Sequence, residues 1–191
     1  MKIYLKMLIV LVVLMSCQDT KKEGNGLISK VEKEEISQKR KMDASKDKQN
    51  KQILTKAQFE DFFPKDIVAY KLFNVSVLMS SAFASAMYVK GNDYDHTLTY
   101  SLEDCNRKGA ANVKNFEASY KIKGQGAPGT EYIYKERDGH KTIAFLQPKI
   151  NRNDLRFVYN NRFRIVIKGA ETIETLWSYI KKEDLQKLDT Y

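Results

Sequence analysis

The chain has 191 residues, of which 42% are hydrophobic, and this length accommodates one compact domain with a tail but is marginal for two domains. Its two cysteines, Cys17 and Cys105, allow at most one disulfide, which excludes the disulfide framework of small secreted domains. The formal net charge of +9 favours contact with anionic surfaces but does not predict a fold.

Residues 1–16 have the pattern of a signal peptide. Lys2 and Lys6 make the start of the chain basic, and residues 7–15 form an unbroken apolar run. A helix over residues 3–15 would span only about 20 Å, which is less than the ~30 Å hydrocarbon core of a bilayer. We therefore expect a cleaved leader and not a transmembrane helix.

The end of this leader resembles a lipobox. Leu14-Met15-Ser16-Cys17 matches the pattern of bacterial lipoproteins, in which a leucine and a small residue precede a cysteine that receives a diacylglycerol. The resemblance implies that the signal peptidase reads Leu14 and Ser16 and cleaves before Cys17. It also implies that Cys17 carries the lipid, usually with a further fatty acid such as palmitate on its amino group. Several acyl chains, at about 0.8 kcal/mol per buried methylene, anchor a protein stably in a membrane.

The residues after Cys17 disfavour a buried thiol at this position and bear on which membrane holds the protein. Cys17 could instead be a buried thiol in an N-terminal core helix, but the polar residues 18–22 leave such a helix no apolar face to pack. In enteric lipoproteins, an aspartate directly after the cysteine retains the protein on the inner membrane. Gln18 stands at this position, so the resemblance favours an outer membrane, with the domain facing the periplasm or the cell surface.

Residues 17–52 are predicted to be the lipidated cysteine and a flexible tether. From Gln18 to Gln52 there are ten Lys or Arg, seven Asp or Glu, no aromatic residue and no proline. Such a segment cannot bury enough apolar surface to fold alone. Because the charges are mixed, a solvated spacer is favoured over a basic patch that binds lipid head groups.

Residues 53–191 contain every proline and nearly all the aromatic residues, and we expect them to form one globular domain. Thr55 can cap a short helix that stops at Pro64. Three phenylalanines, Phe59, Phe62 and Phe63, form its inward face. Alternating apolar residues then predict three strands, over residues 67–77, 81–89 and 97–102. Residues 109–122 have helical spacing and predict a second helix.

Asp138-Gly139 is a typical dipeptide of the two-residue type I′ hairpin. A loop of this length pairs Glu136 with Lys141, Tyr134 with Ile143, and Tyr132 with Phe145. This register places aromatic and aliphatic side chains on one face, as a half-buried antiparallel pair requires.

The next hairpin needs a longer turn. A two-residue Asn160-Asn161 loop would set Phe157 opposite Arg164 and mix core with solvent. A loop that includes Arg162 instead pairs three sets of apolar residues: Tyr159 with Phe163, Phe157 with Ile165, and Leu155 with Ile167. After it, residues 172–182 predict a helix with four inward residues, Ile173, Leu176, Trp177 and Ile180, which Leu185 and Leu188 extend or cap.

These elements predict an α+β fold, with an antiparallel sheet backed by a C-terminal helix and a short N-terminal helix. The layout loosely resembles envelope lipoproteins of unassigned function, and this likeness implies no role for any residue.

Motifs for catalysis, metals and cofactors are weak in this sequence. Residues 124–129, GQGAPG, match G-x-G-x-x-G, but Pro128 and strand-like residues follow where a phosphate-binding helix should begin, which favours a turn. Asn92, Asp93, Asp95 and His96 lack the spacing of a calcium loop, and His140, beside a hairpin turn, is expected to be solvated. We therefore predict no cofactor and no metal.

A nucleophilic enzyme is also disfavoured. The chain has no G-x-S-x-G, and the acidic neighbours of Cys105 should raise the pKa of its thiol, partly offset by Arg107. No pair of carboxylates is singled out by its spacing, so we predict no catalytic residues.

The strongest candidate for binding is the face of the last two strands that points away from the aromatic core. Three basic residues, Arg156, Arg164 and Lys168, alternate there with Val158 and Val166, with Arg152 and Arg162 at the ends. Arginines on a rigid sheet can bind carboxylates or phosphates, although a solvated basic face that blocks aggregation is the simpler interpretation. Nucleic acid is not expected as a partner of an exported chain.

The sequence therefore predicts a lipid-anchored, non-catalytic binding or interaction module that contacts a protein or an anionic component of the cell envelope. The alternatives are an accessory subunit of an envelope complex, which would use an apolar contact, and an unrecognised hydrolase.

Overall fold

The computed structural model describes residues 52–107 and 110–191. The signal peptide, Leu14, Ser16, Cys17 and nearly all of the tether lie outside the described residues. Within these, no helix is long and apolar enough to cross a membrane.

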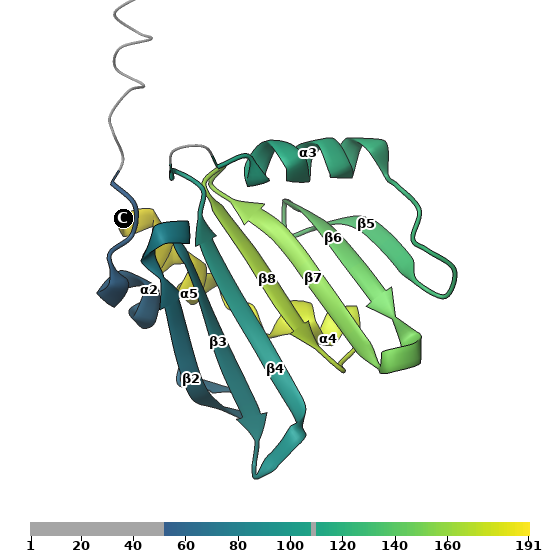
Figure 1. The fold of residues 1–191 in the computed structure, drawn as a ribbon, viewed down its shortest axis with the longest axis horizontal. Helices are drawn as coiled ribbons and strands as arrows, with labels where there is room; N and C mark the ends of the chain where they lie inside the picture. The colour runs from purple at the N-terminus through teal and green to yellow at the C-terminus, as the bar shows by residue number, and fades with distance from the viewer. Residues whose placement is uncertain (1–51, 108–109) are drawn as a thin grey trace, which may run out of the picture. The chain divides into compact units, whose positions relative to one another are not determined.

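The centre of the fold is one eight-stranded antiparallel sheet, and the predicted α+β class is confirmed (Figure 1). The strands are β1 (Asp66–Ile67), β2 (Tyr70–Leu78), β3 (Phe83–Lys90), β4 (Asp93–Asp104), β5 (Glu131–Arg137), β6 (His140–Gln147), β7 (Arg152–Tyr159) and β8 (Phe163–Gly169). Their spatial order is β1-β2-β3-β4-β8-β7-β6-β5. The first four strands and the last four are each consecutive, and β8 returns to pair with β4, which joins the two halves.

Both hairpins have the predicted register. Asp138 and Gly139 have φ values of 47° and 79°, as a type I′ turn requires, and Tyr134 pairs with Ile143. At the β7–β8 turn, Asn160 and Asn161 are both left-handed, with φ of 50° and 52°. Because Arg162 belongs to this turn, the aromatic and aliphatic pairs of β7 and β8 share a face.

The main core lies on one face of the sheet. One row of side chains crosses seven strands on this face: Ile133, Ala144, Leu155, Ile167, Tyr100, Ala86 and Val75. Short helices cover it: α2 (Lys56–Phe62), α4 (Ile173–Ser178) and α5 (Lys182–Lys187). The predicted Thr55 cap of α2 is present, and the Gln58 side chain bonds back to the Thr55 N–H, which completes a capping box. Phe59 and Phe62 are fully buried. Short 3-10 turns, η1 (Met79–Ser81), η2 (Pro148–Ile150) and η3 (Leu188–Thr190), complete the chain.

The single helix expected over residues 172–182 is wrong, because two helices occupy this region. Thr172 caps α4 through the backbone N–H of Thr175, but Lys181 is extended (φ −88°, ψ 141°) and starts a second helix. The change of direction lets Leu185 and Leu188 reach the core, where they are 6% and 2% exposed.

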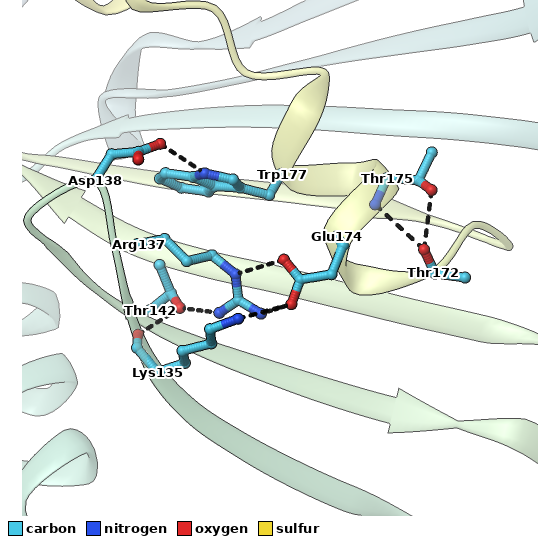
Figure 2. Close-up of polar contacts among 8 residues, drawn as sticks. All are labelled: Lys135, Arg137, Asp138, Thr142, Thr172, Glu174, Thr175 and Trp177. Atoms are coloured by element: carbon cyan, nitrogen blue, oxygen red, sulfur yellow. Dashed lines mark hydrogen bonds and ion pairs between the residues drawn. The ribbon is translucent and has the colours of Figure 1, made fainter.

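Polar contacts hold α4 on the β5–β6 hairpin (Figure 2). The Arg137 side chain is 4% exposed and donates to Glu174 Oε1 over 2.9 Å and to Thr142 Oγ1 over 2.5 Å. Trp177 Nε1 donates to Asp138 Oδ2 in the hairpin turn over 2.9 Å. The donors of the buried guanidinium are used inside the fold, so we assign this cluster a structural role.

The expectation that Arg162 lies at the end of a solvated basic face is also wrong. Its side chain is 8% exposed and forms two parallel bonds to Asp104, Nε to Oδ1 at 3.0 Å and Nη2 to Oδ2 at 2.7 Å. A buried arginine is tolerated here because a carboxylate and backbone carbonyls satisfy its donors.

Candidate functional site

A helix on the opposite face of the sheet creates the candidate site. The helix predicted over residues 109–122 is present as α3 (Asn112–Ile122). Its residue Phe116 is 5% exposed, Tyr120 packs against Tyr134 with ring centroids 6.1 Å apart, and Glu117 forms an ion pair with Lys141. These partners lie on β5 and β6, on the face away from the main core.

The strand register brings the predicted arginines and the aromatic stripe together on this face. A row of neighbours runs from β5 to β4: Tyr134, Ile143, Arg156, Val166 and Ser101. The arginines of β7 and β8 therefore share one surface with the tyrosines of β5, and α3 covers part of it.

A cavity of about 380 Å³ lies between α3 and this surface. The α3 side contributes Asn112, Asn115, Phe116, Ser119 and Ile122, and the strands contribute Tyr132, Tyr134, Ile143, Arg156 and Arg164. The volume is within the range of about 300–1,000 Å³ typical of small-molecule sites. Aromatic walls with a few convergent polar groups are also typical of such sites.

Arg156 lies in the middle of the sheet with part of its hydrogen-bonding capacity unused. Its Nη2 is 3.1 Å from Asp154 Oδ1, which is an ion-pair distance, but Nε and Asp154 Oδ1 are both buried without an aligned hydrogen-bond partner. The guanidinium carbon is 5.9 Å from the centre of the Tyr132 ring. Buried polar atoms without partners are rare, and a bound ion, water or ligand is one common explanation.

Arg164 is held more firmly. Its Nη1 donates to Glu103 Oε2 over 3.3 Å, and Asn112 Nδ2 of α3 donates to Glu103 Oε1 over 2.5 Å. Glu103 is therefore a bridge between β8 and the first turn of α3. Each of the two arginines of the cavity therefore has a carboxylate beside it, Asp154 for Arg156 and Glu103 for Arg164.

The structure does not bring Lys168 into this cavity. Lys168 lies on the same face, but it lines a second, smaller cavity of about 160 Å³ together with His96 and Arg152. Of the three predicted basic residues, only Arg156 and Arg164 share a site.

The GQGAPG segment lies beside the first cavity as the connection between α3 and β5. Tyr134 Oη donates to the Gly124 carbonyl over 3.0 Å, and Gly129 has a φ of 83°. A strand follows the glycines, as the turn interpretation predicted, so they provide no helix N-terminus for a phosphate.

The described residues contain no group of three His, Cys, Asp or Glu side chains that could hold a metal ion. Asp93 bonds to His96 Nδ1 at 2.6 Å, and this hydrogen bond lowers the pKa of the Asp93 carboxyl. The expectation for His140 is wrong: its ring packs against Phe157 and Tyr159, with centroids 5.5 Å and 5.6 Å away. Its side chain is partly exposed and lies on the main-core face of β6, the face that Thr142 and Ala144 share.

Cys105 should react slowly with alkylating agents in the folded protein. Burial, followed by the charge of Glu103, raises the pKa of its thiol to about 11. At pH 8 the thiolate fraction is then roughly 100-fold lower than for a thiol of ordinary pKa. Iodoacetamide labelling followed by mass spectrometry should give a rate at least tenfold below that in denaturant. Equal rates would contradict the burial of this thiol.

No protein-family model, curated protein or solved structure matches this chain. The assignment of a site therefore depends on the geometry of the cavity.

Proposed function

We propose that the protein is a lipid-anchored lipoprotein of the cell envelope whose domain binds an anionic ligand without transforming it. Cys17 carries the lipid, residues 18–52 are the tether, and the α3 cavity is the binding site. One observation carries the binding role: two arginines, which are diagonal neighbours on β7 and β8, line one cavity with aromatic walls. The Leu14–Cys17 pattern supports the anchor.

The electrostatics of the cavity favour a specific small ligand over a broad anionic surface. Because Asp154 and Glu103 are paired with the two arginines, the charge of each guanidinium is balanced locally, and a ligand must be recognised by directed hydrogen bonds. A carboxylate or phosphate can accept these bonds from guanidinium groups. Tyr132 and Phe116 offer apolar surface to the rest of the ligand, which favours an anion with a ring or other apolar body.

The test is a titration of the purified protein with phenyl phosphate, followed by NMR or calorimetry. We expect Arg156→Gln to weaken binding by about 10-fold to 100-fold, since a hydrogen bond to a charged group contributes about 1.5–3 kcal/mol. Arg152→Gln is the matched control, because Arg152 is an exposed arginine on the same strand that does not line this cavity. Circular dichroism establishes that both variants fold.

Ligand analogues and the two variants separate the possible outcomes. Phenol, which lacks the charge, and inorganic phosphate, which lacks the ring, should each bind more weakly than phenyl phosphate. Equal weakening by Arg156→Gln and Arg152→Gln would indicate a general charge effect and contradict the site. No binding of phenyl phosphate, benzoate or phosphate by the unmodified protein would contradict an anion site in this cavity.

The alternative function, an accessory subunit with an apolar contact, is favoured by a separate observation. Apolar side chains are exposed along β2, at the edge of the sheet far from β5.

A further inference from the structure

The two edges of the sheet differ sharply in charge. In β5, four of the seven residues are charged: Glu131, Lys135, Glu136 and Arg137. At the other edge, residues 72–78 of β2, LFNVSVL, contain no charge and no proline. Charged residues and prolines are the usual protection of an edge strand against pairing with another chain. The β5 edge has this protection and the β2 edge lacks it.

The backbone of β2 is open along most of its length. β1 pairs only with Tyr70 and Lys71, and the Leu72 N–H bonds to the Lys65 carbonyl. Beyond this point, no strand of the described chain pairs with residues 73–78 on the outer side. A bulge lies between Leu72 and Asn74, so the regular, open stretch is Asn74–Leu78.

Exposed apolar side chains gather at the same edge. Of the seven large hydrophobic residues that are exposed in the described chain, four lie on β2 or in the turns at its ends: Val68, Phe73, Leu78 and Met79. Phe73 and Leu78 are 54% and 53% exposed. An apolar, uncharged strand edge is a typical surface for the addition of a further strand.

We infer that this edge pairs with the β2 edge of a second copy of the chain, in an antiparallel dimer with its two-fold axis at Ser76. In this register Ser76 faces Ser76, Val75 faces Val77, and Asn74 faces Leu78. The register keeps both faces matched: Val75 and Val77 face the main core in each copy, and Asn74, Ser76 and Leu78 face the α3 side. The two sheets become one continuous sheet.

The second copy fits this edge better than a charged partner does. The open stretch Asn74–Leu78 carries no charge, and the nearest charge on β2, Lys71, already pairs with Asp66 of β1, so no like charges meet across the axis. Each chain has one unprotected edge, at β2. An isologous two-fold contact pairs the β2 edge of one chain with the β2 edge of the other, which closes the assembly at two chains. This inference does not depend on the ligand of the α3 cavity.

Disulfide trapping tests the register directly. Facing residues in an antiparallel pair have Cα atoms about 4.5–5.5 Å apart, which is within the range for a disulfide. We expect full-length Ser76→Cys, in native membranes under mild oxidation, to form a covalent dimer at least tenfold faster than Glu131→Cys. Glu131 is the matched control, since it is exposed on the protected edge. Mass spectrometry should identify a peptide pair linked from position 76 to position 76.

A second variant tests the association without a crosslink. Ser76→Lys places two like charges at the axis, and because Ser76 is exposed, the fold should be retained. Sedimentation of the detergent-solubilised protein should show a dimer for the unmodified chain and a monomer for Ser76→Lys. Equal trapping of Ser76→Cys and Glu131→Cys, a link from position 76 to another protein or within one chain, or unchanged sedimentation of Ser76→Lys would each overturn the proposed dimer.

Discussion

Replacement of Asp104 by alanine should lower the free energy of unfolding by about 3–5 kcal/mol, which corresponds to a decrease in Tm of roughly 10–20 °C. The reason is that Arg162 would remain buried without its counter-ion. Its Nη1 and Nη2 also donate to main-chain oxygens of Tyr191 and Gln52, at 2.7 Å and 3.0 Å. Asp104 in turn accepts the backbone N–H of Leu54 at 3.0 Å. The Arg162–Asp104 pair therefore joins both ends of the described chain to the sheet.

Thermal and urea unfolding, followed by circular dichroism, measure this effect. Arg152→Ala, which removes an exposed arginine, is the control and should change the stability by less than about 0.5 kcal/mol. The double variant Asp104→Leu with Arg162→Met should be more stable than Asp104→Ala, because it leaves no charge buried alone. If Asp104→Ala and Arg152→Ala unfold at the same temperature, the Arg162–Asp104 pair does not hold the chain ends.

The features predicted correctly from the sequence are those that depend on neighbouring residues. Asp138-Gly139 favours positive φ at both positions, and this preference alone sets the register of β5 with β6. Thr55 and the following phenylalanines set the start and the inward face of α2 in the same way. Each of these signals lies within about ten residues of chain, where local sterics and hydrogen bonding decide.

The pairing of β4 with β8 could not be predicted, because it joins segments about sixty residues apart. Nothing in either strand specifies the partner, since both are apolar on one face and polar on the other. β6 and β7 are instead consecutive strands joined only by residues 148–151, but no turn dipeptide in this connection predicts their register, and this register determines the site. The arginines and the tyrosines were both correctly placed on alternating faces, but only the β6–β7 register puts Ile143 beside Arg156.

Arg162 was misplaced because its burial depends on the same pairing of β4 with β8. A basic residue next to two asparagines in a turn is normally solvated. Its burial depends on Asp104, which lies at the end of β4 and becomes its neighbour only when β4 pairs with β8. The residues Asn112, Asn115 and Phe116 were missed as site residues for the same reason, since the face that α3 covers is determined by the whole sheet. The helical spacing of residues 109–122 predicts the helix but not its position.

The largest expected effect is that of Cys17→Ser, which should abolish lipidation completely. A serine oxygen does not replace the sulfur that the resemblance assigns to the diacylglycerol. The lipoprotein signal peptidase acts on the lipidated precursor, so residues 1–16 should remain attached. Labelling with radioactive palmitate should be absent, and intact-mass measurement should find a chain that begins at Met1. Globomycin treatment of the unmodified protein should also retain the leader.

Cys105→Ser is the matched control for this experiment, because it removes the other cysteine of the chain and leaves the lipobox unchanged. It should incorporate palmitate as the unmodified protein does and stay with the membrane fraction. The physical basis is the strength of the anchor: one acyl chain binds a membrane only marginally, whereas several bind stably. A soluble chain of mature length from Cys17→Ser would show that the leader is cleaved without lipid. That result would contradict the proposed membrane anchor. Ligand binding in the α3 cavity could still be measured on the soluble domain.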